Sequence, residues 1–519
     1  MATTLGEMAS DSWKSQKRRG MQLFNKFLAQ CEHREETTWD QLTESTLCSH
    51  KIYEEFADFL TLNYKIEPTM RNAGKFLSAG TVRNMLGIVL NLAVETYQVI
   101  GSAESKVFLT CVNPVGRSTG WRWLQSLKIK ITRTCFKRAK ESGETLDQSC
   151  TALYASRVEK MTGALAKTNS KEAVTRKLAI LTLWLVAGRA AELAYMTIRS
   201  AVWDPFYSAL FVEVPQEKVA KVKHIAIVAG AKRHRDFFVS LGDSLTVEQR
   251  PPTEDDEVDW WFPAINDSAY PGQMLGGFIK ALKPEDRGGL QRYSNVSVPE
   301  LPDDAAAGGF RPGVCNTLSP AMPVDWVVLS TGHNLSGASA FFEYLDSNFA
   351  WLIVAALILA GWPPFTWGRT GLGPKPPSLE PLVASVDLAA LDRAIDCQFN
   401  LDSASPEAFK LRGKLRPLMR VAYASMVMYY EERYHAQEMT FVLTRMRAVL
   451  MQFKLGGDDG PGGAHDKLVE WGIKIRAKFD RDNLHLTTRA HAPDVEPIVA
   501  AVANLASRVD SQQGEVAET

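Results

Sequence analysis

Gly308-Gly-Phe-Arg-Pro-Gly313, Ser330-Thr-Gly-His-Asn-Leu335 and Phe342-Glu-Tyr-Leu-Asp346 are the segments around which this chain is organised. They supply a cation, an imidazole and a phenol. Arg311 precedes His333 by 22 residues, and His333 precedes Tyr344 by 11. The intervening segment is apolar and compatible with a helix, and Gly332 breaks it just before His333. This layout can aim three polar groups at one point, although a buried polar network has the same pattern.

The composition is that of a globular protein. The chain has 519 residues, which is enough for roughly three domains of ordinary size. It is 45% hydrophobic and 23% charged, so a sizeable core is expected. The formal net charge is zero, so a nucleic-acid partner must be recognised through local clusters of charge.

Cysteine usage and the N-terminus indicate an intracellular protein. The seven cysteines form no C-x-x-C pair, and the first residues lack the apolar segment of a signal peptide. The most apolar run, Phe349–Trp362, has 14 residues. Because a helix needs roughly 20 residues to span a bilayer, no membrane is expected.

No cofactor or metal is expected. The sequence contains neither the H-E-x-x-H zinc motif nor the phosphate-binding G-x-x-x-x-G-K-[ST] loop. The acidic residues between 254 and 259 resemble a two-metal nuclease cluster only superficially, since they lie in a proline-rich connection that is typical of a solvated loop.

The N-terminal region is predicted to be a helical module over residues 21–150, after a polar tail at 1–20. Apolar residues recur at helical spacing, and Ser78 precedes a further apolar helix. Eight cations in the 24 residues from 117 to 140 lack any acidic neighbour within that range and favour contacts with double-stranded DNA over a solvated amphipathic face. These cations are Arg117, Arg122, Lys128, Lys130, Arg133, Lys137, Arg138 and Lys140.

The central region is predicted to combine helices with a small antiparallel sheet. Within residues 171–198, apolar residues from Leu178 to Val186 predict a buried helix, which leads into Gly188-Arg-Ala-Ala-Glu-Leu193. Three β-type runs follow, at 209–214, 224–228 and 237–241, with lysines 218, 221 and 223 between the first two. The basic turn before the third run adds DNA-contact candidates at Lys232, Arg233 and Arg235. The predicted fold class is therefore mainly α with a small antiparallel β-sheet, α+β.

This ordered set of residues resembles the catalytic domain of the tyrosine recombinase, or phage integrase, family. The set consists of an arginine with a glutamate one turn later, a hairpin lysine, a second arginine about 120 residues on, a Gly-His pair and a terminal tyrosine. The resemblance covers residues 155–348, and its second half is most similar to the eukaryotic Crypton mobile elements. The helical module at 21–150 resembles the core-binding domain of that family.

The resemblance implies a specific chemistry. Tyr344 would attack a DNA phosphodiester and form a 3′-phosphotyrosyl link, which is covalent catalysis. Arg189 and Arg311 would hold the phosphate oxygens, with Glu192 supporting Arg189, and His333 would bind a phosphate oxygen. A hairpin lysine would protonate the leaving 5′-oxygen: Lys218 is the first choice and Lys221 the second. The family further implies recombination or integration of DNA by a homo-oligomer, a tetramer on DNA, in the nucleus.

One position departs from the family pattern. The family has H-x-x-R at the second arginine, whereas this chain has Gly308 three residues before Arg311. Because a phenol with a pKa near 10 needs help to lose its proton at neutral pH, activity is in question. The alternatives are a catalytically lapsed DNA-binding protein on a recombinase scaffold and, more distantly, a type IB topoisomerase.

The remaining third of the chain is predicted to be helical and receives no function. Residues 349–378 are interpreted as a docking helix followed by a proline-rich linker. The apolar helix in this stretch would dock either onto a neighbouring protomer or into the core of its own chain. Residues 379–519 are expected to form several helices.

Overall fold

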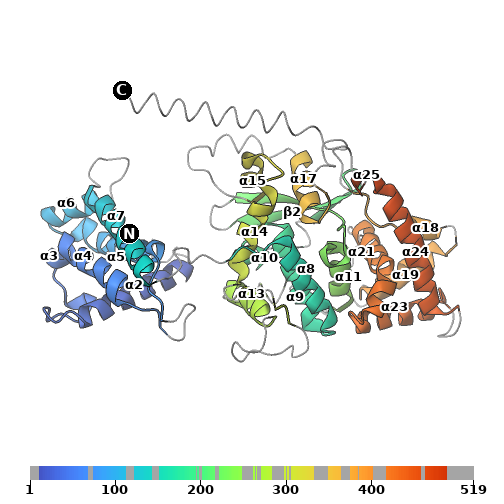
Figure 1. Cartoon of the computed structure of the whole chain (residues 1–519), viewed down its shortest axis with the longest axis horizontal. Helices are drawn as coiled ribbons and strands as arrows, with labels where there is room; N and C mark the ends of the chain where they lie inside the picture. Colours follow the sequence, from blue (N-terminus) through green and yellow to red (C-terminus); the bar gives the residue numbers. More distant parts are fainter. Residues whose placement is uncertain are drawn as a thin grey trace, which may run out of the picture. The chain divides into compact units, whose positions relative to one another are not determined.

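The computed structural model divides into two compact units, residues 1–149 and 150–519 (Figure 1). The structure describes residues 11–67, 74–112, 122–142, 151–194, 196–197, 201–216, 221–247, 261–262, 265, 271–282, 297–299, 301–302, 305–331, 349–363, 374–383, 385–400, 416–456 and 462–487. The fold is mostly helical with one three-stranded antiparallel sheet, which confirms the predicted α+β class.

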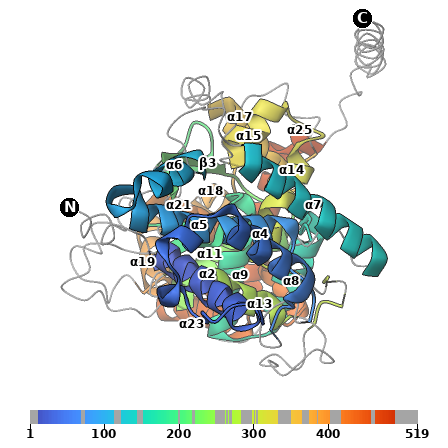
Figure 2. The ribbon, with the colours of Figure 1, turned by 90° about the vertical axis from the view of Figure 1, so that its left-hand side faces the viewer.

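The first unit is a helical bundle gathered around α5 (Figure 2). Its α-helices and its one π-helical turn, η2, are α2 (Asp11–Ala29), α3 (Glu44–Leu47), α4 (His50–Asp58), η2 (Phe59–Asn63), α5 (Ala79–Ile100), α6 (Ala103–Val112) and α7 (Arg122–Ser142). The predicted helix start at Ser78 is confirmed, because its hydroxyl accepts a hydrogen bond from the Thr81 backbone N–H. Interlocked aromatic side chains, Phe24 and Phe56 among them, fill the core.

The expected polar tail ends earlier than predicted, because α2 begins at Asp11. Lys17, one of the cations assigned to that tail, lies over the ring of Trp13 and pairs with Glu95 of α5 at 2.6 Å. Gly20 is buried against Ile88, where an added Cβ would lie 2.7 Å from the Ile88 side chain. The basic residues are therefore the solvent-facing side of an amphipathic helix.

The second unit contains the sheet and the remaining helices. Its helices are α8 (Ala155–Lys167), α9 (Lys171–Leu185), α10 (Ala190–Ala194), α11 (Phe237–Val247), α13 (Pro271–Lys280), α14 (Phe310–Leu318), α15 (Val324–Thr331), α17 (Phe349–Leu359), α18 (Glu380–Val383), α19 (Leu388–Gln398), α21 (Arg416–Met428), α22 (Tyr430–His435), α23 (Thr440–Gln452), α24 (Ala464–Asp482) and α25 (Leu484–Thr487). The strands are β1 (Ala201–Asp204), β2 (Ala209–Gln216) and β3 (Lys221–Ile227), in the order β1-β2-β3.

Two of the predicted strands are present and the third is wrong. The predicted runs at 209–214 and 224–228 fall in β2 and β3, but β1 is the third strand and 237–241 is the start of α11. The Asp236 carboxylate accepts a hydrogen bond from the Val239 backbone N–H at 3.0 Å and so caps this helix. Nearly all of α11 is buried against α9 and α21, so it shows no amphipathic pattern that would distinguish it from a buried strand.

One continuous hydrophobic core joins the sheet, its covering helices and the C-terminal helices of this unit, from Leu153 to Leu486. In Figure 1 the orange and red helices α21–α24 lie beside the green helix α11. Helix α17 packs on β3 and α14, and the Trp184 indole N–H donates to the Leu359 carbonyl at 3.0 Å. The apolar helix therefore packs into the core of its own chain.

Two features are absent from the described part of the chain. None of its helices is long and apolar enough to cross a membrane. Within the same residues, no group of three or more His, Cys, Asp or Glu side chains is arranged to hold a metal ion.

Candidate active site

The first arginine lies in a tight turn between α9 and α10. Helix α9 ends at Leu185, and Ala187 adopts the left-handed region with φ of 45°. The Gly188 backbone N–H donates to the Leu183 carbonyl at 3.1 Å, which closes the end of the helix. An added Cβ at Gly188 would lie 2.7 Å from the Val186 side chain, so glycine is needed here for close packing. Arg189 follows immediately.

The second arginine is held by a glycine-rich contact. Arg311 lies in the first turn of α14, which packs against the chain at residues 151–153. The Leu153 backbone N–H donates to the Gly309 carbonyl at 2.9 Å. An added Cβ at Gly313 would lie 2.0 Å from the Leu153 carbonyl oxygen, so only glycine allows this approach. The backbone beside Arg311 is thereby fixed.

Glu192 of α10 brings the two arginines together. Its Oε1 lies 3.1 Å from Arg189 Nη1 and 3.8 Å from Arg311 Nη1. Its Oε2 accepts a hydrogen bond from the Arg189 backbone N–H at 3.0 Å. Only 4% of the Glu192 side chain is exposed, so this carboxylate serves the two cations and not solvent. The predicted supporting contact between Glu192 and Arg189 is present.

The guanidinium of Arg311 is buried yet unsatisfied. Its side chain is 10% exposed, and Nε, Nη1 and Nη2 have no hydrogen-bond partner among the residues that the structure describes. Burial lowers the pKa of Arg311, the charge of Arg189 lowers it further, and Glu192 opposes both effects. Because buried donors in native proteins are almost always paired, this group is arranged for a partner that supplies acceptor oxygens.

A lysine that the sequence analysis did not select completes the cluster. Lys223 of β3 is buried, and its Nζ donates to the Val186 carbonyl at 2.5 Å, just before Arg189. Burial lowers the pKa of Lys223 to about 7; Arg311 and Arg189 lower it, while Glu192 raises it. At neutral pH this amine is therefore close to the midpoint of its titration, as a proton donor requires.

Strand register contains the signal that identifies this lysine. Lys223 pairs directly with Val214 of β2, and Ile225 pairs with Val212. Directly paired residues lie on one face, and these neighbours are buried. A lysine in phase with the inward side chains of a strand therefore points into the core, whereas the sequence analysis favoured a lysine nearer the hairpin turn.

The cluster is thus a buried, positively charged site. Arg189, Arg311 and Lys223 face a single carboxylate, so the described side chains leave an excess of positive charge. Planar guanidinium groups match the oxygens of a phosphate or another oxyanion. The Lys223 amine beside them, with its lowered pKa, can transfer a proton. Together these groups can bind an oxyanion and deliver a proton to it.

Several predicted site residues lie outside the described residues, namely Lys218, His333, Tyr344 and Arg117. Lys221 begins β3, and its side chain also lies outside the description. Gly308 lies in the short 3-10 turn before α14, where it is exposed and contributes no side chain to the cluster.

The predicted DNA-binding cations of α7 have different environments. Arg122, Lys130, Arg133, Lys137 and Lys140 are exposed, and Lys128 is half-buried. Lys130 pairs with Asp58 at 2.9 Å, but both side chains are largely exposed, so this pair stabilises the fold little. Arg138 has a structural role, because it donates to the carbonyls of Thr61 and Leu77 and lies over the Phe76 ring.

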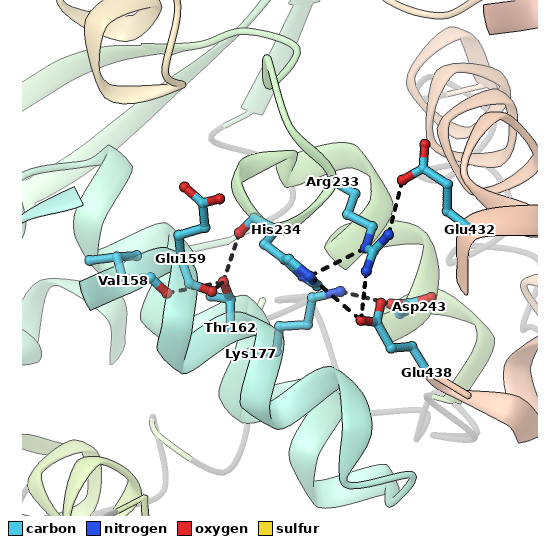
Figure 3. A network of polar contacts seen from close by, with 9 residues as sticks. All are labelled: Val158, Glu159, Thr162, Lys177, Arg233, His234, Asp243, Glu432 and Glu438. Carbon is cyan, nitrogen blue, oxygen red and sulfur yellow. Dashed lines mark hydrogen bonds and ion pairs between the residues drawn. The ribbon is translucent and has the colours of Figure 1, made fainter. Parts of the chain in front are cut away.

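The basic turn at 232–235, which was predicted to contact DNA, has its charges paired with acidic side chains of the protein. Lys232 and Arg235 lie 3.1 and 3.3 Å from the carboxylate of Glu159 in α8. Arg233 pairs with Glu432 and Glu438, as Figure 3 shows. The positive charges of this turn are therefore used to join segments of the second unit.

No family model matches the chain, and no curated protein matches it. Among solved structures the chain is similar to the FLP recombinase in a Holliday junction complex, with 10% sequence identity and a TM-score of 0.27. That similarity covers 64% of this chain and 82% of the other. A TM-score this low does not carry a shared fold, so function is inferred from the side chains of the site.

Proposed function

We propose that this protein is a tyrosine recombinase that cuts and rejoins double-stranded DNA through a 3′-phosphotyrosyl intermediate. The observation that carries the proposal is the unsatisfied, buried guanidinium of Arg311 beside Arg189, Glu192 and Lys223. A scissile phosphate supplies the acceptor oxygens that Arg311 lacks. The two arginines would stabilise the charge of the pentacoordinate transition state.

In this reaction the Tyr344 oxygen forms a bond to phosphorus while the bond from phosphorus to the 5′-oxygen breaks. The leaving oxygen needs a proton. We assign this proton to Lys223, in the role that the sequence analysis gave to Lys218, because its Nζ is buried beside the arginines. His333 would bind a phosphate oxygen. Rejoining reverses these steps, so no external energy source is required.

The exposed cations of α7 would bind DNA backbone phosphates away from the scissile bond. The same proposal includes assembly as a homo-oligomer, a tetramer on DNA, residence in the nucleus and origin in a Crypton-type mobile element. These parts rest on the sequence resemblance.

Gly308 favours a second candidate, a DNA-binding protein whose chemistry has lapsed, because the position lacks the imidazole that would take the proton of the phenol.

Trapping of a covalent adduct tests the reaction. Nicked suicide duplexes from the flanks of the gene are incubated with the full chain and with Tyr344→Phe, and adducts that resist denaturant are measured. An adduct that Tyr344→Phe abolishes supports the recombinase. Salt-sensitive DNA binding without an adduct supports the lapsed protein.

A substrate with sulfur in place of the bridging 5′-oxygen tests the proton donor. A thiolate leaves without protonation, so this substrate should restore adduct formation to Lys223→Met. Lys218→Met and Lys221→Met serve as matched controls, with unchanged rates expected on the ordinary substrate. Rescue of Lys218→Met, with Lys223→Met unaffected, would return the role to Lys218.

A further inference from the structure

A network of buried charges ties the C-terminal helices to the elements that carry the site (Figure 3). At its centre is Asp243 of α11, whose carboxylate is fully buried. One oxygen lies 3.2 Å from Lys177 Nζ of α9, and the other accepts a hydrogen bond from Arg433 Nη2 of α22 at 2.6 Å. The side chains of both cations are also almost fully buried.

A second part of the network holds the 3-10 turn η6 (Arg233–Arg235), which follows β3. Arg233 Nη1 donates to Glu432 at 2.9 Å, and Arg233 Nη2 donates to Glu438 at 3.0 Å. From the other side, the Thr162 hydroxyl of α8 donates to the His234 carbonyl at 2.8 Å. The turn is thus held between α8 and the segment from α22 to α23.

His234 in this turn is a neutral member of the network. Burial and the charges of Lys177 and Arg233 lower the pKa of His234 to about 3. Its Nε2 accepts a hydrogen bond from Arg233 Nε at 3.2 Å, as a neutral imidazole can. Although Nε2 lies 3.5 Å from Glu438, this contact is therefore no ion pair at neutral pH.

The network includes residues near both partners of the hydrogen bond between Lys223 Nζ and the Val186 carbonyl. Lys177 lies on α9, which ends at Leu185, and Val186 is the capping residue nine residues, or about 13 Å, after Lys177. Arg233 lies ten residues after Lys223, and the connection between them is restrained. In that connection, the Trp362 indole N–H donates to the Ala229 carbonyl at 2.7 Å.

We propose that Arg233 is a positioning residue. Through it the C-terminal helices hold β3 in place against the end of α9, so that Lys223 stays bound to Val186 beside the arginines. The effect of Arg233 on catalysis rests on the proposed reaction. Its effect on the position of Lys223 is independent of that reaction. Buried ion pairs stabilise a fold less than apolar packing does, but they can restrict the chain to a single arrangement. The C-terminal helices, to which the sequence assigned no role, become part of the site.

The test compares Arg233→Gln with Arg476→Gln in the full chain. Arg476 is a matched control, because it also donates to Glu432, at 3.0 Å, and is exposed to a similar extent, but belongs to α24. The first measurement is the pKa of Lys223. NMR monitors its titration on protein labelled with 13C at the lysine ε carbon. Lys223→Arg assigns the signal.

We expect Arg233→Gln to move the pKa of Lys223 upward by about one unit or more, as the amine leaves its buried position. We expect Arg476→Gln to leave it unchanged. A folded Arg233→Gln protein with the titration of the parent would overturn the proposal. If Arg233→Gln does not fold, Glu432→Gln decides, because that carboxylate is half exposed: a smaller upward shift supports the proposal and no shift overturns it.

Adduct formation provides the second measurement. Arg233→Gln should form the adduct roughly tenfold or more slowly than the parent, at unchanged DNA affinity, because a small misplacement of a catalytic group is costly. Arg233→Lys should recover part of the rate. If the parent itself forms no adduct, the proposed function fails, while a shifted Lys223 titration in Arg233→Gln still supports the positioning role.

Discussion

Replacement of Arg311 by methionine is predicted to leave the second unit at least as stable as the parent while removing its response to phosphate. Methionine keeps the length of the buried stem and removes a charged group that has no hydrogen bonds within the described residues. A buried arginine is usually paired with an acidic group of the same protein. This one is expected to serve a bound anion instead.

The magnitude follows from the contacts of Arg311. Attraction to Glu192 at 3.8 Å is worth about 4 kcal/mol at an effective dielectric constant of about 20. Three buried donors without partners cost about 1–3 kcal/mol each, and Arg189 adds repulsion. We therefore expect the free energy of unfolding of Arg311→Met to equal that of the parent or to exceed it by about 2 kcal/mol.

The assay is urea denaturation followed by tryptophan fluorescence, with and without phosphate. A bound anion at 100 times its dissociation constant stabilises the parent by about 2.7 kcal/mol, and Arg311→Met should lose this gain. Arg433→Met is the matched control, since Arg433 is equally buried but paired with Asp243 at 2.6 Å. That control should lose about 3–5 kcal/mol. A loss above about 2 kcal/mol in Arg311→Met, or an undiminished phosphate response, would refute the reasoning.

Four further predictions concern the same site. The folded-state pKa of Lys223 is about 7 and the ordinary value is 10.5, so between these pH values the unfolded state binds more protons than the folded state. The free energy of unfolding should therefore rise with pH across this window. Lys223→Met should flatten that rise. Adduct formation should fall as the pH rises through about 7, since the protonated amine is the donor. Glu192→Gln should destabilise the fold by about 2–4 kcal/mol in urea, less than a fully buried pair would, because Arg189 is 37% exposed, and added phosphate should not restore the loss. Gly313→Ala should lower the melting temperature in calorimetry and weaken phosphate binding together, because its Cβ would lie 2.0 Å from the Leu153 oxygen; a variant with unchanged melting would show that α14 can shift freely.

The sequence predicted the parts of the fold that follow from local periodicity. Apolar residues at helical spacing identified the helices of the first unit, and runs of β-type residues identified β2 and β3. The assignment failed at 237–241, where the chain is buried on all sides and helix and strand look alike. It also failed at 11–20, where the polar face of an amphipathic helix was interpreted as a tail.

The candidate site was predicted only in part, because its residues meet through long-range contacts. Arg189 and Glu192 are one turn apart, so their contact follows from local geometry. That Arg311 joins them depends on the packing of α14 against residues 151–153, which no local pattern records. The choice among the hairpin lysines required the pairing register of β2 with β3. The roles of Arg233 and Arg235 depended on acidic partners that lie far away in the sequence.

The buried carboxylate of Asp243 has a consequence for the synthesis of the chain. Its lysine partner is 66 residues earlier, but its arginine partner is 190 residues later. At about 5–20 residues per second, the ribosome needs roughly 10–40 s to translate the interval up to Arg433. Until then one oxygen of the buried Asp243 carboxylate lacks its hydrogen-bond donor, in a place where the core should close. A premature stop before Arg433 should therefore yield a product whose core does not close and which proteases remove.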